Sequence, residues 1–264
     1  MLTAPMVCSM SDDDQAKAVE NAPSHVAQLE ALWPLAKKKL LSLKGIPTWM
    51  RLKRRYDLRF LQIGELRVEV PAGLMPDCEG CTELCCTGPN AEVTLRMRDI
   101  CALLDSGLQD AISVGERNVI DKKEKYSTRW RMRQTFFGNV FPVLKRDSTL
   151  TCVLLDEKRQ CNAWPQWPLS CARYPYSVDA THKVLFLAGG CRSHRTMGAG
   201  DVPDAVRKLV RAAVDGYNER IKDLILLHLV LEEVHAIGVT PFLDLPHGLK
   251  EQLSSSKRAV VDLS

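Results

Sequence analysis

The sequence predicts an α+β protein in which a small cysteine-rich metal-binding domain packs against N-terminal helices and a long C-terminal helix. Three observations lead to this fold class. Four cysteines crowd into the nine residues of Cys78–Cys86. Short β-rich runs and turns rich in proline and glycine follow this group, so the domain is expected to consist of short strands and loops. Apolar residues recur with helical spacing on both sides of it.

Length and composition exclude several classes of protein. The 264 residues suit one large domain or two small ones. A hydrophobic fraction of 45% and a charged fraction of 26% are ordinary for a globular chain. The net charge of +4 is mildly basic, and it falls well short of an electrostatic argument for nucleic-acid binding.

The N-terminus predicts a cytoplasmic protein. Residues 1–23 are polar, carry the acidic run Asp12–Asp14, and lack the basic and apolar segments of an export signal. The longest apolar block, Leu224–Leu231, is far shorter than the roughly 20 residues of a membrane span, so no membrane contact is expected. Cytoplasmic thiols stay reduced, and the ten cysteines therefore indicate metal rather than disulfides.

Helical periodicity and helix-end signals set the boundaries of the chain. Ser24 opens a helical pattern that Pro34 is expected to kink or to restart. A second pattern begins near Pro203 and stops at Gly238. These signals predict a mobile tail over 1–23, N-terminal helices over 24–61, the cysteine-cluster domain over 62–197, a C-terminal helix or helix pair over 201–238, and a frayed tail over 239–264.

Shorter elements are expected inside the cysteine-cluster domain. The run from Met97 to Leu104 looks helical and ends at Gly107, whereas the proline- and aromatic-rich stretch 164–175 cannot be a regular helix. Residues 110–127 are polar and without clear period. Strand character is expected at 62–70, 92–95, 128–133 and 184–187, and a hairpin at 151–161.

Eight of the ten cysteines are candidate metal ligands. Cys8 is set aside because it lies in the tail. Cys101 is set aside because its apolar neighbours mark it as a small core residue. Thiolates are the preferred ligands of zinc and of iron–sulfur clusters. The predicted metal ligands are Cys78, Cys81, Cys85, Cys86, Cys152, Cys161, Cys171 and Cys191.

The spacing restricts the kind of centre without naming the metal. A zinc ribbon needs two CxxC pairs, and this chain has only Cys78–Cys81. The order C-x2-C-x3-C is the reverse of a radical-SAM site. Adjacent Cys85 and Cys86 suit either one ligand beside one neighbouring thiol, or two separate ions. An iron–sulfur cluster of unspecified type and zinc both stay open as the cofactor.

A site with four or more thiolates needs positive charge nearby, because Zn²⁺ with four thiolates carries a net charge of −2. His194 also lies near the last cysteine, but an isolated histidine is usually neither a ligand nor a proton-transfer group. The candidate cations close in sequence to the later cysteines are Arg173, Lys183, Arg192 and Arg195.

The order and spacing of these motifs resemble the zinc- or iron-chelating domain family named for its CxxCxxCC motif, whose members carry eight cysteines. The resemblance covers about residues 75–195. Trp167 and Ala172 stand where members often carry arginine, and Arg173 is a candidate substitute. The resemblance implies a metal domain, and relatives of this domain occur in a flagellin lysine methylase. It rests on Cys78-x2-Cys81-x3-Cys85-Cys86, Val93-Thr94-Leu95, Asp99, Cys152-Val153-Leu154-Leu155, Cys161, Trp164, Trp167–Tyr176 and Cys191.

Three functions follow as expectations. The first is a metal-binding protein that holds an iron–sulfur cluster or zinc, with no defined biochemical role. The second is a structural zinc domain that acts as a partner-binding module through its C-terminal helix. The third is a group-transfer enzyme related to methylases. The chain has no nucleotide-binding glycine loop, no GxSxG and no paired-histidine protease motif, so catalytic residues are not assigned and an enzymatic role stays open.

Two groups of arginines raise nucleic-acid or protein binding as a further alternative. A helix with one charged face and a solvated sheet face are the simpler interpretations of these groups. The arginines are Arg51, Arg54 and Arg55 in the first group and Arg129, Arg131 and Arg133 in the second.

Overall fold

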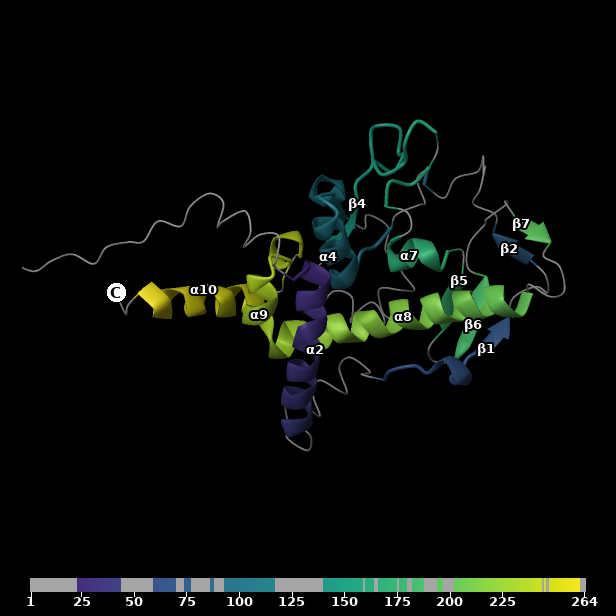
Figure 1. The fold of residues 1–264 in the computed structure, drawn as a ribbon. Coiled ribbons are helices and arrows are strands. Elements are labelled where there is room, and N and C mark those ends of the chain that lie inside the picture. Colours follow the sequence, from purple (N-terminus) through teal and green to yellow (C-terminus); the bar gives the residue numbers. More distant parts are fainter. Residues whose placement is uncertain are drawn as a thin grey trace, which may run out of the picture.

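The computed structural model describes residues 23–43, 59–69, 74–76, 86–87, 93–116, 140–158, 160–163, 166–174, 176–179, 182–187, 194–196, 202–243, 245 and 247–261. In these ranges the chain mixes helices with short strands, which confirms the α+β class. One long helix runs through the molecule, with short strands along one half of it and other helices around the other half (Figure 1).

The helices and strands follow one another in a fixed order. The α-helices are α2 (His25–Ser42), α4 (Met97–Asp105), α7 (Leu169–Ala172), α8 (Val202–Leu229), α9 (Leu231–Ala236) and α10 (His247–Val261). The strands are β1 (Arg67–Glu69), β2 (Leu74–Pro76), β3 (Ile112–Glu116), β4 (Val140–Leu144), β5 (Tyr176–Asp179), β6 (Val184–Leu187) and β7 (His194–Thr196). Single 3₁₀ turns are η1 (Ile63–Glu65), η2 (Gln109–Ala111) and η3 (Thr240–Phe242).

The described strands form three small sheets. The first has the order β1-β6-β5, with β1 parallel to β6 and β6 antiparallel to β5. The second is an antiparallel pair of β2 and β7, and the third an antiparallel pair of β3 and β4. Each sheet joins segments far apart in sequence, so the region predicted as the cysteine-cluster domain is held by long-range pairing.

Helix α2 begins where the sequence predicts. The hydroxyl of Ser24 accepts the amide N–H of Ala27 at 3.2 Å and caps the first turn. The helix then continues through Pro34 as one element, so of the two predicted effects of this proline a new helix start is wrong. Near its C-terminal end, Lys39 Nζ donates to the carbonyl oxygen of Leu229 at 3.0 Å and lies 3.3 Å from Glu233 Oε1. This lysine therefore fixes α2 on the junction of α8 and α9.

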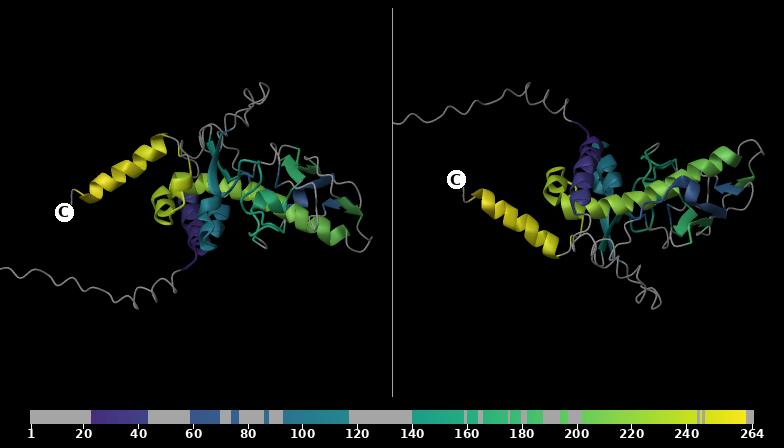
Figure 2. Two further views of the ribbon diagram at one scale, coloured as in Figure 1. Left: turned by 90° about the horizontal axis from the view of Figure 1, so that it is seen from above. Right: turned by 90° about the horizontal axis from the view of Figure 1, so that it is seen from below.

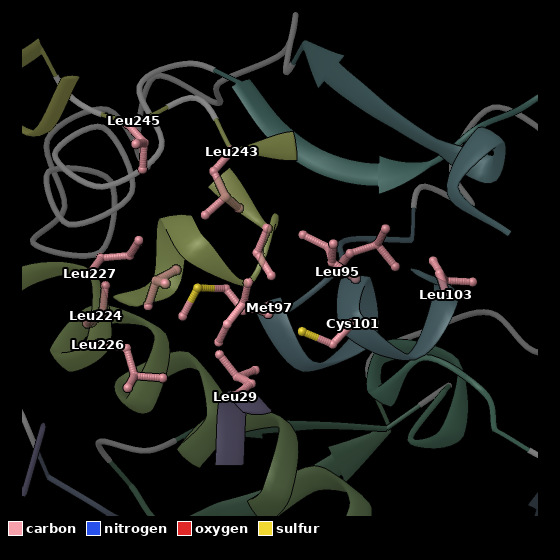
Figure 3. Close-up of a cluster of buried hydrophobic side chains, with 14 of the residues drawn as sticks. Leu29, Leu95, Met97, Cys101, Leu103, Leu224, Leu226, Leu227, Leu243 and Leu245 are labelled. Carbon is pink, nitrogen blue, oxygen red and sulfur yellow. The ribbon is translucent and has the colours of Figure 1, made fainter. Parts of the chain in front are cut away.

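The apolar face of α8 forms the centre of the molecule. Its C-terminal half packs with α2, α4, α9 and the segment after α9 into the larger core (Figure 3). Its N-terminal half packs with β5, β6 and Leu61 into a smaller core, and Tyr217 contacts both. In the described ranges no helix is long and apolar enough to cross a bilayer. The buried α8 residues are Val210, Ala213, Val214, Ile221, Leu224, Ile225, Leu226 and Leu227.

Several predicted elements are confirmed. α4 occupies the expected range, and Gly107 follows it with a positive φ of 68°. Strand β6 matches the predicted strand residue for residue. The second helical pattern is indeed a helix pair, α8 and α9, ended by Gly238 with φ of 86°.

Other predictions need correction. Residues 112–116 form strand β3, although the stretch 110–127 has no clear period. The expected strand at 92–95 is reduced to a single antiparallel bridge between Thr94 and Val143. A one-turn helix, α7, lies inside the proline-rich stretch. The predicted strand at 128–133 lies outside the described residues.

The C-terminal segment, expected to be a frayed tail, contains a helix. Helix α10 follows η3 and projects away from α8, as Figures 1 and 2 show. Leu249 and Leu253 are its half-buried apolar residues and pack against the larger core. The remaining described side chains of α10 are mostly exposed, so the helix is anchored by its first turns.

The start of α2 is also held by a carboxylate from α4. Asp105 accepts the amide N–H groups of His25 at 2.6 Å and of Val26 at 3.1 Å, and its oxygen lies 2.6 Å from His25 Nδ1. Burial raises the pKa of Asp105, but these hydrogen bonds and the charge of His25 outweigh burial and lower the pKa below its ordinary value. The ionised carboxylate thus ties two helices together.

We predict that Asp105→Asn lowers the free energy of unfolding by about 1 kcal/mol, the usual cost of losing a helix cap. Because the pKa of Asp105 is lowered by folding, its stabilisation is present above the unfolded pKa of about 4 and is lost as the pH falls further. Urea unfolding at pH 7 and pH 3 measures this. The exposed Asp110→Asn is the control, and equal losses for the two variants would contradict the prediction.

The interior also contains a carboxyl group without full pairing. Asp223 of α8 is 2% exposed, and its Oδ2 receives only a long bond of 3.5 Å from the amide N–H of Met97. Its other oxygen, Oδ1, has no hydrogen-bond partner among the described residues. Burial raises the pKa of Asp223 to about 7, with smaller contributions from Arg96, which lowers it, and from Glu219 and Asp99, which raise it.

We predict that stability falls as the pH rises through the range between the unfolded pKa of Asp223, about 4, and its folded pKa of about 7. In this window the folded chain holds a proton that the unfolded chain has released. The slope from one such group is at most about 1.4 kcal/mol per pH unit. Urea unfolding of the native protein and Asp223→Asn from pH 4 to pH 8 isolates this contribution. A stability difference that is constant with pH would contradict it.

Candidate metal centre

The structure brings four of the eight predicted ligands into one region. Cys86, Cys152, Cys161 and Cys171, here called the thiol cluster, come from a turn, from the loop 152–163 and from α7. All four carry thiols rather than disulfides. Cys152 is part of the larger core, and the other three pack against it.

Main-chain hydrogen bonds join the first two members of the thiol cluster. The carbonyl oxygen of Cys86 accepts the amide N–H of Cys152 at 2.8 Å. Cys152 also forms an antiparallel bridge with Arg146, which follows β4. The two cysteines, far apart in sequence, are therefore held at adjacent positions by backbone alone.

The loop that carries Cys152 and Cys161 has two similar thiol environments. Cys161 forms an antiparallel bridge with Leu155, and the amide N–H of Asn162 donates to Leu154 at 2.7 Å. The amide two residues after each cysteine, Leu154 for Cys152 and Ala163 for Cys161, donates to the sulfur. Such N–H···S bonds favour a thiolate and are typical around bound metals. The predicted hairpin at 151–161 is therefore a compact loop closed by a single bridge.

The fourth thiol lies on the one-turn helix α7. Its first amide N–H, from Leu169, donates to Asp99 Oδ1 at 3.0 Å, and the hydroxyl of Ser170 donates to the carbonyl of Thr94 at 2.8 Å. Arg173, the C-cap of α7, lies close to Gly216 of α8. Cys171 is thus positioned through contacts of its neighbours with two other segments.

Burial and mutual repulsion keep these thiols protonated. Burial is the main cause that raises the pKa of Cys152, Cys161 and Cys171. A second cause is their proximity, because the charge of Cys86 raises the pKa of all three of them. The thiol cluster can ionise together only if positive charge enters it.

Two arginines bring positive charge close to the cluster: Arg146, whose charge lowers the pKa of Cys152, and Arg173, which lies close to Cys171. Arg173, a predicted cation, is half-buried and donates to the carbonyl of Tyr176 at 2.9 Å. Burial and the charge of Arg96 lower the pKa of Arg173, whereas the Cys171 thiol raises it. Arg96, which sequence reasoning missed, lies close enough to interact with Arg173, Asp99 and Asp223.

The other predicted cations do not join the thiol cluster in the part of the chain that can be described. Lys183 lies 3.4 Å from Glu65 and stabilises the turn before β6 instead. Arg195 lies in β7, and Arg192 lies outside the described residues. Of the four candidate cations, only Arg173 is shown to lie beside a cysteine.

Three buried carboxyl groups lie close to one another near Arg96. Asp99, Glu219 and Asp223 are 5%, 8% and 2% exposed; the charge of Glu219 raises the pKa of Asp99 and Asp223, and that of Asp99 raises the pKa of Asp223. Lys222 Nζ donates to Glu219 at 2.6 Å. Only Asp99 could have been found from sequence, as a position of the motif. Glu219 and Asp223 resemble ordinary polar positions of an amphipathic helix.

The β2–β7 pair lies next in sequence to two further predicted ligands, Cys78 and Cys191, which are themselves outside the described residues. Its ladder ends at Pro76 paired with His194, so His194 has a strand position. Pro76 precedes Cys78 by two residues, and His194 follows Cys191 by three. The chain therefore enters the segment with Cys78 and leaves the segment with Cys191 at neighbouring points of one ladder.

The donor set fits a thiolate-bound metal in chemistry, since the thiols of the cluster are soft ligands with N–H donors beside them. In the described ranges, however, no three His, Cys, Asp or Glu side chains stand in an arrangement that would hold a metal ion. The ligands Cys78, Cys81, Cys85 and Cys191 lie outside the described residues, as do Cys8 and the arginines Arg51, Arg54, Arg55, Arg129, Arg131 and Arg133.

Cys101 has the position expected of a core residue. It is fully buried on α4 among apolar neighbours (Figure 3). Burial raises its pKa to about 12, and the nearby charges of Asp105 and Asp223 add to the effect. Unlike the thiol cluster, this thiol is not coupled to another cysteine of the described ranges.

Comparisons with protein-family models, with curated proteins and with solved structures find no match to this chain. The resemblance to the CxxCxxCC family therefore rests on the motif residues alone.

Proposed function

We propose that this chain is a metal-binding protein whose thiol cluster, together with the remaining predicted cysteines, holds zinc or an iron–sulfur cluster. The observation that carries the proposal is the convergence of Cys86, Cys152, Cys161 and Cys171. The charge of Cys86 acts on the pKa of Cys152, Cys161 and Cys171, although Cys171 lies 85 positions further along the chain. The full ligand set adds Cys78, Cys81, Cys85 and Cys191.

Electrostatics supports a cation as the occupant. Buried thiols that repel one another are costly to ionise, and a metal cation removes this cost because it binds the thiolates directly. Arg173 beside Cys171 and Arg146 beside Cys152 offset part of the negative charge that remains. The N–H groups that donate to the sulfurs of Cys152 and Cys161 stabilise the thiolate form. Thiolates bind a cation and not an anionic or neutral ligand.

The proposal is tested on protein purified without oxygen. Zinc, iron and acid-labile sulfide are measured per chain, together with the visible absorption spectrum. We expect at least about one bound metal per chain, with colour and sulfide for an iron–sulfur cluster and without them for zinc. Protein that carries neither metal, and that takes up no Zn²⁺ when fully reduced, would overturn the proposal.

Substitution of one cluster thiol gives a second prediction. We expect Cys171→Ser to lower bound metal by at least half, since serine is a poor ligand for zinc or iron at neutral pH. The matched control is Cys101→Ala, at another buried cysteine. This variant should keep its metal while losing about 1 kcal/mol of stability through the lost sulfur contacts. Equal metal contents for the two variants would remove Cys171 from the ligand set.

A further inference from the structure

The proposed centre depends on a residue that is not a ligand. Asp99 is 5% exposed on α4, and its two carboxylate oxygens have different partners. Oδ2 accepts the amide N–H of Arg96 at 2.8 Å, which caps the helix that Asp99 belongs to. Oδ1 accepts the amide N–H of Leu169 at 3.0 Å, on a segment 70 residues away.

We propose that Asp99 is a positioning residue for the metal centre, which orients Cys171 through the hydrogen bond to the Leu169 amide. This inference rests on the proposed function. The inference adds that Cys171, the proposed ligand on α7, is oriented by a residue of another helix, Asp99 of α4. Asp99 itself touches no metal in this account and acts only through Cys171.

The shortness of α7 makes an outside contact necessary. A helix of four residues, Leu169–Ala172, has almost no hydrogen bonds of its own to hold its direction. Its first amide groups have no partner within the helix. Asp99 supplies an acceptor for Leu169, and the carbonyl of Thr94 accepts the hydroxyl of Ser170 at 2.8 Å. Both partners belong to the segment that leads into α4 or to α4 itself.

The charges around Asp99 support the same role. Burial is the largest cause and raises the pKa of Asp99 above its ordinary value; the amide N–H groups of Arg96 and Leu169 and the guanidinium of Arg96 offset this in part, and Glu219 adds to it. Asp99 also lies close enough to Cys171 for its charge to act on the thiol. Both oxygens of Asp99 accept an amide N–H, and asparagine has only one acceptor oxygen, so Asp99→Asn takes the acceptor from one of these two N–H groups.

The test is a double-mutant cycle on the full-length reduced protein. The variants are Asp99→Asn, Cys171→Ser and their combination, titrated with Zn²⁺ against a chromophoric chelator. Co²⁺ is the spectroscopic probe, because its thiolate-to-metal absorption reports how many sulfurs bind. We expect Asp99→Asn to weaken Zn²⁺ binding by about 10- to 100-fold and to reduce the Co²⁺–thiolate band toward that of Cys171→Ser. In the Cys171→Ser background the further loss should be under about threefold.

A control variant with a comparable expected loss of stability distinguishes an effect on the position of Cys171 from an effect on folding. Asp105→Asn breaks a comparable carboxylate contact, also from α4 to a distant helix start, but at the other end of α4. It should lower stability and leave Zn²⁺ affinity and the Co²⁺ spectrum as in the native protein. An Asp99→Asn effect that is equally large with and without Cys171, or a native spectrum for Asp99→Asn, would overturn the positioning role.

A second pair of variants covers the case in which Asp99→Asn does not fold. Leu169→Pro removes the N–H donor together with the leucine side chain, and proline suits this position because Pro168 before it is already extended, with φ of −52° and ψ of 141°. Leu169→Ala removes the same side chain but keeps the donor. We expect the reduced Co²⁺–thiolate band in the proline variant alone, and equal bands would contradict the inference.

Failure of the inference and failure of the proposed function give different results. If the native protein binds neither Zn²⁺ nor Co²⁺, both fall together. If the native protein binds metal and the losses from Asp99→Asn and Cys171→Ser simply add, only the positioning role falls. A non-additive loss together with an unaffected Asp105→Asn protein supports both.

Discussion

Burial of the apolar face of α8 is the constraint on which the rest of the structure depends. The loops that carry the thiol cluster have few regular hydrogen bonds and little apolar surface of their own, so they cannot compensate the entropy lost on ordering. α8 provides a long continuous face, from Val210 to Leu227, against which both cores form. Tyr217 contacts both cores and makes them continuous. The described part of the thiol-cluster region is therefore ordered by tertiary packing before any metal is considered.

The parts of the fold that could be predicted from sequence are those with local signals. α2, α4 and α8 combine helical periodicity with a cap or a glycine end, and these signals need no distant partner. β3 could not be found because Ser113 and Gly115 have low strand propensity, and its partner β4 lies beyond a long intervening segment. α10 was missed because its middle, from Ser254 to Arg258, is polar and separates Leu249 and Leu253 from the apolar residues at its end. α7 was missed because a single turn held by Asp99 leaves no periodicity.

The cysteines of the candidate site could be selected from the sequence, whereas the charged residues around them could not. The cysteine spacing alone predicts that Cys86, Cys152, Cys161 and Cys171 lie close together, and the structure places these four in one region. The charges around them carry no such signal. Arg96 and Asp223 look like ordinary surface residues in sequence, and only the packing of α4 on α8 places them inside. Lys183 shows the reverse error, because closeness in sequence to Cys191 did not bring it to the thiol cluster.

Charge couples the thiol cluster to the interior beyond it. Cys171 interacts with Asp99, and Asp99 with Asp223, so ionisation at one end opposes ionisation at the other. Under the proposed function, Zn²⁺ with four thiolates would leave a net charge of −2 beside these carboxyls. Arg146 and Arg173 can offset it, but the remainder favours a protonated Asp223. A protonated Asp223 explains why its Oδ1 is buried with no hydrogen-bond partner among the described residues, since a neutral carboxyl group tolerates burial far better than a carboxylate. The charge of the proposed metal centre and the protonation of the buried Asp223 therefore depend on each other.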